Sequence, residues 1–482
     1  MAVNMNNFTA TPRHQIPPIA KSLQTTFKLG KTRNIAFRKN QLKQFWTLID
    51  ENEAELQQCL LKDLRKPVIE TQIMELMAVK NEIGSMLTNM DTWLAAKSAP
   101  DIPIEYKVFA PTIHKQPLGT CLVIGAWNYP FVLPAAPFVA VIAAGNTGIM
   151  KPSELAPATA MALANLVPRY LDQSCYRVIN GGEPVVTTHL KEKFGHICYT
   201  GGANVGRIIM HAAAQHLTPV TLELGGKSPV IITKNADIMV AATRTVWGKF
   251  ACAGQTCVAP DYAMVEECVK DEFLNALQQA ITRFYQEKPH AEGKMARIVN
   301  LRHWERITNL IRRTTGNIIA GGHGDENTLF IEPTVVSNVS LDDALMSDEI
   351  FGPILPVISI SSLEEGCELI PRISEDPLSL YLMTEDSKEV DYVLRNTKSG
   401  GVAINDTMTQ LAVPNLPFGG VGRSGIGAYR GQAGLDACSH KKSIVSVPSS
   451  AEDSLQWRYP TGVDADVAEK LTWLRHTMEA QL

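Results

Sequence analysis

The segment Phe250-Ala-Cys-Ala-Gly-Gln-Thr-Cys257 places a cysteine in a glycine- and alanine-rich setting near the middle of the chain. A cysteine attacks a carbonyl carbon as its thiolate, and small neighbours leave the backbone open to an approaching substrate. The chain holds nine cysteines, and a free cysteine is usually a small buried hydrophobic residue. Cys257 is therefore predicted to be a nucleophile only because residues of matching chemistry accompany it.

Three polar residues lie in unusually apolar or glycine-rich surroundings. Asn128 lies just past a short apolar strand, where a fixed amide could donate a hydrogen bond to an oxyanion. Glu223 lies between two leucines, and burial there would raise its pKa toward that of a general base. Glu349 precedes Ile-Phe-Gly-Pro. Singly, each fits a turn or a helix cap better than a catalytic role; together with a thiol they indicate chemistry at a carbonyl.

A second group of residues is suited to binding a nucleotide. The loop Gly201 to Gly206 follows an apolar strand and precedes a helical stretch, where a phosphate would meet free backbone N–H groups. Its G-x-x-x-x-G spacing is not followed by Lys-Ser/Thr, which disfavours ATP, and a plain strand-to-helix turn remains an alternative. A formal G-x-G-x-x-G at 420–425 lacks a preceding apolar strand and a clear following helix, so it is predicted to be only a loop.

Lys151 and Glu154 directly follow another predicted strand. A lysine at the carboxyl end of a strand is well placed for a ligand, and a following carboxylate could accept hydrogen bonds from ribose hydroxyls. The alternative is a helix start, with Pro152 and Ser153 as capping residues and Glu154 favourable to the helix dipole. Both descriptions can hold together.

The elements that must position these residues follow from the apolar pattern. Helical spacing dominates from about residue 32 to 96, and prolines 100, 103 and 111 then mark an extended or looped stretch. From residue 120, short apolar strands alternate with helices, which is typical of βαβ units and a parallel sheet. A second α/β block follows at about 229–413. The predicted fold class is therefore α/β.

Composition excludes several classes of protein. At 482 residues the chain is about three domains long, and its net charge of −4 provides no basic field for nucleic acid. The cysteines are scattered without a C-x-x-C pair, which argues against a disulfide scaffold or zinc ribbon and favours a cytoplasmic location.

Membrane attachment is also disfavoured by the sequence. Residues 1–10 show no leader pattern, and residues 470–482 no anchor-length apolar run. The uncharged stretch 116–150 contains four prolines, so strand–loop–helix–strand is favoured over a membrane span.

Seven strings, in order, resemble the aldehyde dehydrogenase superfamily, and within it the class 3 branch that acts on fatty, aromatic and coniferyl aldehydes. The similarity extends from about residue 32 to 460. The strings are Ile124-Gly-Ala-Trp-Asn-Tyr-Pro, Lys151-Pro-Ser-Glu, Leu222-Glu-Leu-Gly-Gly-Lys-Ser-Pro, Gly254-Gln-Thr-Cys-Val-Ala-Pro-Asp, Glu349-Ile-Phe-Gly-Pro, Gly401-Val-Ala-Ile-Asn-Asp and Leu416-Pro-Phe-Gly-Gly-Val-Gly. The segments 30–33 and 421–429 are similar to class 3 in particular.

The resemblance implies a reaction and a role for each matching catalytic position. Cys257 would attack an aldehyde, the Asn128 amide and the Cys257 N–H would hold the oxyanion, and hydride would pass to NAD or NADP. Glu223 would activate the water that releases the carboxylic acid from the thioester. The class 3 resemblance also allows the position of Glu349 to share the base role, so the division between these two carboxylates stays open.

The resemblance also implies the cofactor contacts. NAD is favoured over NADP because Glu154 would repel a 2′-phosphate. One departure concerns the phosphate loop, which usually reads Gly-Ser-Thr-x-Val-Gly: Gly202 and Ala203 remove a hydroxyl, so an altered grip on the cofactor is expected. The implied cofactor-binding residues are Trp127, Lys151, Glu154, Gly201, Gly202, Ala203, Val205, Gly206, Leu224, Glu349 and Phe351.

The implied architecture has a Rossmann-like cofactor domain, an α/β catalytic domain and a small oligomerisation element in a homodimer. The predicted boundaries are 1–226, 227–415 and 416–482, with residues near 100–118 joining the oligomerisation element. A relative that passes the thioester to CoA is one alternative, disfavoured because such relatives generally lack the glutamate found here at 223. A non-catalytic relative is another, disfavoured because the four reactive positions are intact.

Overall fold

The computed structural model describes residues 8–286, 289–291, 293–455, 459, 469, 471–472 and 475. The chain forms two compact units. The large unit comprises residues 1–93 and 117–439, and the small unit comprises residues 94–116 and 440–482. The predicted absence of a leader in residues 1–10 and of an anchor in residues 470–482 concerns segments that lie mostly outside the described residues.

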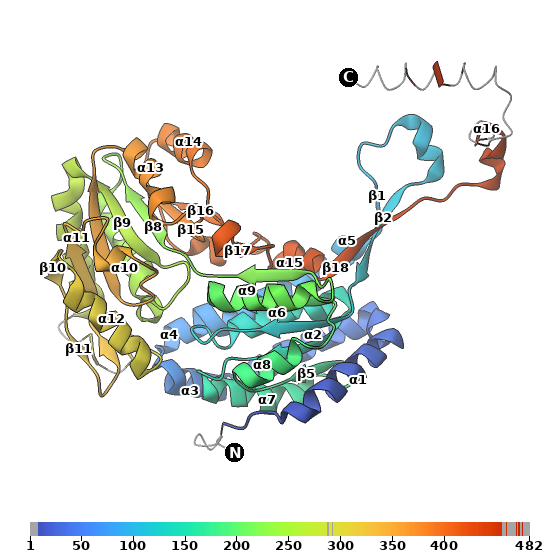
Figure 1. Cartoon of the computed structure of the whole chain (residues 1–482), viewed down its shortest axis with the longest axis horizontal. Coiled ribbons are helices and arrows are strands. Elements are labelled where there is room, and N and C mark those ends of the chain that lie inside the picture. Colours follow the sequence, from blue (N-terminus) through green and yellow to red (C-terminus); the bar gives the residue numbers. More distant parts are fainter. Residues whose placement is uncertain are drawn as a thin grey trace. The chain divides into compact units, whose positions relative to one another are not determined.

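The large unit contains a six-stranded sheet in the order β17-β7-β6-β3-β4-β5 (Figure 1). Its first five strands in the chain are parallel to their neighbours, and β17 is antiparallel to β7. β3, β4 and β6 are buried along their whole length, as expected for strands that helices cover on both faces. The strands are β3 (Thr120–Ile124), β4 (Thr147–Lys151), β5 (Tyr176–Val178), β6 (His196–Thr200), β7 (Val220–Glu223) and β17 (Gly425–Ile426).

Four crossover helices connect these strands: α6 (Val132–Ala144), α7 (Pro157–Tyr170), α8 (Glu183–His189) and α9 (Ala203–Ala214). The chain runs from β3 to β4 and β5 on one side, then returns past β3 to β6 and β7 on the other. The strand order therefore reverses between β3 and β6. In open α/β sheets this reversal leaves a crevice beyond the carboxyl ends of the strands, where ligands bind.

A seven-stranded sheet in the order β10-β13-β14-β9-β8-β15-β16 forms the second part of the large unit. The largest hydrophobic core surrounds it. In Figure 1, α10 and α11 lie against the sheet on one side and α13 and α14 on the other. The strands are β8 (Ser228–Ile232), β9 (Pro260–Glu266), β10 (Asn317–Ala320), β13 (Thr334–Ser337), β14 (Ile354–Ile360), β15 (Ser379–Met383) and β16 (Gly401–Ile404). The helices are α10 (Ile238–Phe250), α11 (Lys270–Tyr285), α12 (Leu301–Arg313), α13 (Leu363–Ile373) and α14 (Ser387–Asn396); β11 (Gly324–Asp325) and β12 (Phe330–Ile331) form a separate hairpin.

The N-terminal part of the large unit is helical, as its sequence pattern predicts. A five-residue π-helical segment, Gln72–Leu76, interrupts the series, and such segments often occur at functional sites. The helices are α1 (Ile16–Lys28), α2 (Ile35–Glu51), α3 (Glu53–Leu64), α4 (Val68–Thr71) and α5 (Met77–Leu94). A helix from much later in the sequence, α15 (Gly431–Ala437), packs against α6.

The small unit contains a three-stranded sheet in the order β1-β2-β18, and α16 (Glu452–Leu455). Its strands are β1 (Lys97–Ser98), β2 (Thr112–Pro117) and β18 (Ser439–Ile444). Residues Ile104–Phe109 form a 3₁₀ helix, so the stretch between Pro100 and Pro111 is not entirely extended or looped as its prolines predicted.

The uncharged stretch 116–150 forms strand, loop, helix and strand, which confirms its prediction. Helix α6 is buried on all sides and accommodates Pro134 in its first turn, where no intrahelical N–H is needed, and Pro137 in its interior. None of the helices that the structure describes is long and apolar enough to span a bilayer. The sequence at 420–425 contains a short 3₁₀ helix, Gly422–Ser424, and the first residue of β17, so it is not entirely a loop as predicted.

Candidate active site

The predicted reactive residues gather where the two sheets of the large unit meet. Glu223 is the last residue of β7, and Asn128 follows β3 by four residues. Both therefore lie at the carboxyl edge of the six-stranded sheet. Cys257 and Glu349 lie just before β9 and β14, at the amino ends of parallel strands in the other sheet.

A cavity of about 270 Å³ has Cys257 and Asn128 on its wall. Most of its other lining side chains are apolar, among them Met74, Met77, Val132, Leu133, Trp247, Leu411 and Phe418. Its volume lies just below the range of about 300–1,000 Å³ typical of small-molecule sites. The structure thus places the predicted nucleophile and the predicted oxyanion donor on one apolar pocket.

The surroundings of the Cys257 thiol favour its protonated form. Burial is the main cause, and the nearby carboxyl groups of Glu349 and Glu223 add to it; together they raise the pKa of Cys257 to about 12. Only a thiolate is nucleophilic, so a base must take the proton as the thiol attacks. The two residues that disfavour a free thiolate are the same two that can accept this proton.

Glu223 has an unusual environment for a carboxyl group. Its side chain belongs to a residue only 2% exposed, and among the described residues neither of its carboxyl oxygens has a hydrogen-bond partner. Burial without compensation raises its pKa well above the usual value. A buried, unpartnered carboxyl is costly to the fold, and such groups are expected where function requires them.

Glu349 is partly buried and packs on a glycine. A Cβ atom at Gly225 would lie 2.2 Å from its Oε2, so that position has no room for a side chain. Burial, reinforced by the charge of Asp261, raises the pKa of Glu349 to about 8 despite hydrogen bonding from the Gly226 backbone. A carboxyl with this pKa exchanges its proton near physiological pH, which suits a general base.

The amide of Asn128 is fixed by the cysteine loop. Its Nδ2 donates to the backbone oxygen of Gln255 at 2.9 Å, and the residue is buried. An amide NH₂ group carries two hydrogens, so one remains to donate to a ligand at the cavity wall. This hydrogen bond ties Asn128 to the loop that carries Cys257, although the two residues are far apart in the sequence.

The phosphate-loop candidate begins α9. Gly202 takes the N-cap position, and in the described part of the chain no side chain caps that helix. A Cβ atom at Gly202 would meet nothing within 4 Å, whereas Cβ atoms at Gly201 and Gly206 would clash with Tyr199 and Leu224 at 2.2 and 2.7 Å. Open space in front of free helix N–H groups is what a phosphate requires.

The other predicted cofactor contacts lie nearby in the fold. Lys151 ends β4, and its Nζ donates to Glu154 Oε2 at 2.7 Å. The Trp127 ring meets the Phe351 ring edge-on, with ring centroids 5.3 Å apart. Ala203 and Val205 belong to the first turn of α9. These residues and the open loop fit a dinucleotide that follows the carboxyl edge of the sheet.

Comparison with known proteins places this chain in a family. Residues 4–444 match the model of the aldehyde dehydrogenase family. The chain belongs to the aldehyde dehydrogenase family. It is 41% identical to rat aldehyde dehydrogenase family 3 member A2, over 92% of the chain and 91% of that protein. It is 40% identical to the dimeric NADP-preferring aldehyde dehydrogenase of dog, over 92% of the chain and 98% of that protein.

A solved structure gives the same result. The substrate-bound state of Staphylococcus aureus AldH is 40% identical, with a TM-score of 0.88 over 93% of the chain and 96% of that structure. The predicted family, α/β fold class and oxidoreductase activity are thereby confirmed.

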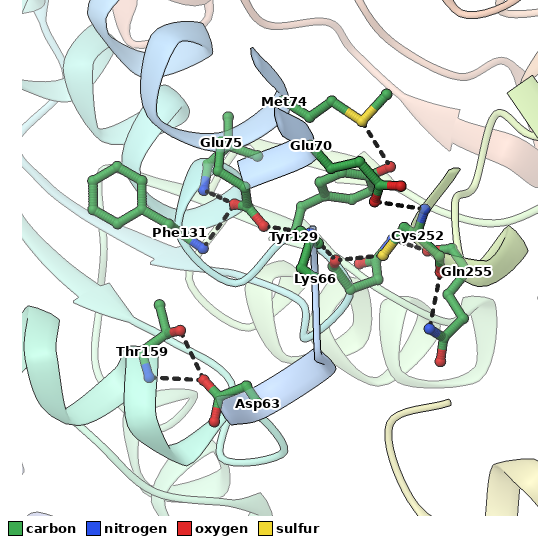
Figure 2. A network of polar contacts seen from close by, with 12 residues as sticks. Asp63, Lys66, Glu70, Met74, Glu75, Tyr129, Phe131, Thr159, Cys252 and Gln255 are labelled. Carbon is green, nitrogen blue, oxygen red and sulfur yellow. Dashed lines mark hydrogen bonds and ion pairs between the residues drawn. The ribbon is translucent and has the colours of Figure 1, made fainter. Parts of the chain in front are cut away.

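Sequence reasoning missed a group of polar residues behind the site (Figure 2). Lys66 is fully buried, and its Nζ bonds Glu75 Oε1 at 2.6 Å and the backbone oxygen of Asn128 at 2.9 Å. Glu70 Oε2 accepts from the backbone N–H of Cys252 at 3.0 Å. Lys66 lies in the short connection 65–67 between α3 and α4, and Glu70 and Glu75 lie on the helical segments that follow, where charged residues are usually exposed. Their spacing therefore gave no signal of burial.

Proposed function

We propose that this aldehyde dehydrogenase oxidises an apolar aldehyde to its carboxylic acid through a thioester on Cys257. The observation that carries the proposal is the buried carboxyl of Glu223, unpartnered within the described residues and close enough to Cys257 to raise its thiol pKa. A fold that maintains such a group beside a thiol has a base ready for proton transfer. The Asn128 amide on the same cavity supplies the oxyanion donor.

The first step forms a bond between Cys257 Sγ and the aldehyde carbon. The thiol proton passes to a carboxylate, and the carbonyl oxygen gains negative charge that the Asn128 amide stabilises. When bound, NAD(P) supplies the acceptor for the hydride that leaves this carbon as the C=O bond re-forms. In the last step Glu223 takes a proton from water, water attacks the thioester carbon, and the carbon–sulfur bond breaks to release the acid.

Two carboxyls are available for two proton transfers. Glu223 has the more strongly buried carboxyl, and we assign it to the hydrolytic step. Glu349, with a pKa near 8, is assigned a share of the base role at the thiol. Neither assignment requires a bound metal.

The cofactor is proposed to lie along the carboxyl edge of the six-stranded sheet. The first turn of α9 would hold its pyrophosphate, Lys151 and Glu154 its adenosine ribose, and Glu349 with Phe351 its nicotinamide ribose. Glu154 favours NAD, although the dog relative is named NADP-preferring. The position of Gly202 leaves room for the phosphate but offers no hydroxyl to bind it.

The cavity supports an apolar substrate of moderate size. Ile73, Met77 and Trp247 line it and are also 53%, 48% and 41% exposed, which places apolar side chains at its mouth. An aromatic or medium-chain aldehyde fits this lining, and a longer chain would extend across the mouth. Transfer of the thioester to CoA is the weaker alternative, because Glu223 provides the base that hydrolysis needs.

Replacing the nucleophile tests the proposal. Cys257→Ala should abolish NADH formation from benzaldehyde or hexanal, followed by absorbance with NAD and NADP side by side. Cys367→Ala removes another buried cysteine, from α13, and serves as the matched control that keeps activity. Normal turnover by Cys257→Ala would overturn the mechanism, and acyl-CoA rather than acid as the product would favour the alternative.

We further propose a homodimer in the cytoplasm. The dimer is supported by the name of the dog relative, and a cytoplasmic location by nine unpaired cysteines. The division at residues 226/227 and 415/416 is retained as a proposal. Light scattering should give twice the chain mass; the mass of one chain would contradict the dimer.

A further inference from the structure

A buried ion pair lies behind the oxyanion donor. Lys66 Nζ and Glu75 Oε1 are 2.6 Å apart, and both side chains are fully shielded from solvent. An isolated buried pair contributes little net stability, because the loss of hydration offsets the attraction between the charges. The other hydrogen bonds of Lys66 and Glu75 indicate a second role for this pair.

The pair holds the segment that carries Asn128 at two places. Lys66 Nζ donates to the backbone oxygen of Asn128 at 2.9 Å. Glu75 Oε2 accepts from the backbone N–H groups of Phe131 and Val132 at 3.1 and 2.9 Å, at the start of α6. Figure 2 shows these contacts converging on one short stretch of backbone. Two buried charged side chains therefore fix the backbone of residues 128–132.

The cysteine loop meets the same stretch of backbone. The Cys252 thiol donates to the Asn128 backbone oxygen at 3.3 Å, so this oxygen accepts from two groups. The hydroxyls of Tyr129 and Thr256 share a hydrogen bond of 2.8 Å, and the Tyr129 ring lies 3.9 Å from Lys66 Nζ. Hydrogen bonds thus join the loop before the nucleophile to the loop with the oxyanion donor, next to the ion pair.

Glu70 supports the cysteine loop from the same helical region. It accepts from the N–H of Cys252, a residue in the left-handed conformation at φ 52° that side chains other than glycine rarely adopt. One region of the chain, 66–75, therefore contacts both loops that form the reactive centre.

We propose that Lys66, held by Glu75, is a positioning residue that fixes the Asn128 backbone and so directs its side-chain amide to the oxyanion formed at Cys257. The inference rests on the proposed function, because it assigns Asn128 the oxyanion role. Hydrogen-bond donors act on an oxyanion only within about 2.7–3.1 Å. A misplacement of about 1 Å can lower the rate about 100-fold.

The test is a double-mutant cycle between the pair and Asn128. Lys66→Met alone would leave Glu75 buried without its partner, so Lys66→Met/Glu75→Gln is the variant of choice, with folding checked by thermal melting. The rate of the first NADH turnover is measured by stopped flow with saturating NAD and hexanal. A role that is only structural would slow the reaction whether or not Asn128 is present.

Asn128→Ala should lower this rate about 10²- to 10³-fold. The pair variant should lower it about 10- to 100-fold with unchanged KM for NAD. In the Asn128→Ala background the pair variant should add no more than about twofold, because the group that it positions is gone.

Lys249→Met is the matched control. Lys249 is also fully buried, and its Nζ lies 3.4 Å from Asp261. When Lys249 is replaced, Asp261 still has an ion pair with Lys227. Lys249→Met should lower the rate of the first NADH turnover by the same factor in the wild-type and Asn128→Ala backgrounds. The inference is overturned if the pair variant also lowers this rate by the same factor in both backgrounds, or if the pair variant reacts at the wild-type rate. An Asn128→Ala variant with full activity would instead refute the oxyanion role in the proposed function, and the inference with it.

Discussion

Replacing Glu223 by glutamine removes the buried base while keeping its shape. In the wild-type protein the carboxyl is buried, and its pKa lies well above the usual value because of burial alone. The amide cannot accept a proton from water. Since hydrolysis of the thioester is the step assigned to Glu223, formation of the thioester should survive the change.

The kinetic magnitude follows from general-base catalysis, which contributes about 10²- to 10⁴-fold. Steady-state kcat of Glu223→Gln should fall by that factor. Rapid mixing with NAD and hexanal should still give a burst of about one NADH per active site. Mass spectrometry should then find the acyl group on Cys257.

The same variant should also change how the free energy of unfolding depends on pH. A carboxyl whose pKa is raised in the folded protein keeps its proton after the unfolded chain has lost it, so the free energy of unfolding falls as pH rises above the unfolded pKa. The decrease is at most about 1.4 kcal/mol per pH unit. Glutamine does not titrate, so Glu223→Gln should become progressively more stable relative to wild type as the pH rises above the pKa of the unfolded carboxyl.

Urea unfolding at several pH values provides the measurement. A stability difference that stays constant across these pH values would refute the environment inferred for Glu223. Loss of the burst would refute the assignment to hydrolysis and place Glu223 before hydride transfer.

Three further predictions concern the cofactor and the second base. Gly202→Ser places a hydroxyl at the N-cap of α9, where the described residues leave room for it; the KM for NAD should fall a few-fold, and an unchanged KM would exclude a phosphate contact there. In wild type the burst rate should rise with pH and level off above about pH 8, as the Glu349 carboxyl ionises. Glu349→Gln should flatten this rise. An unaltered pH profile would instead assign the thiol proton to Glu223. Glu154→Gln frees Lys151 from its ion pair and removes a repelling charge, so the ratio of kcat/KM for NADP over NAD should rise about tenfold; no change would place the 2′-phosphate elsewhere.

Local patterns in the sequence account for much of the fold and for the reactive residues. The alternation of apolar strands and helices after residue 120 predicted the parallel sheets, because strands covered on both faces must be continuously apolar. Glycine and alanine around Cys257 indicated an approachable backbone. The prolines of the uncharged stretch 116–150 excluded a spanning helix, although α6 accommodates two of them.

The sequence by itself therefore predicted which residues could carry the chemistry and on which elements they lie. Only the tertiary structure decided their electrostatic state and their support. Burial raises the pKa of Glu223, and burial together with the carboxyl groups of Glu349 and Glu223 raises the pKa of Cys257. Both shifts arise only when distant segments pack together. The same holds for Lys66, whose bond to Asn128 spans 62 residues and leaves no periodic signal in the sequence.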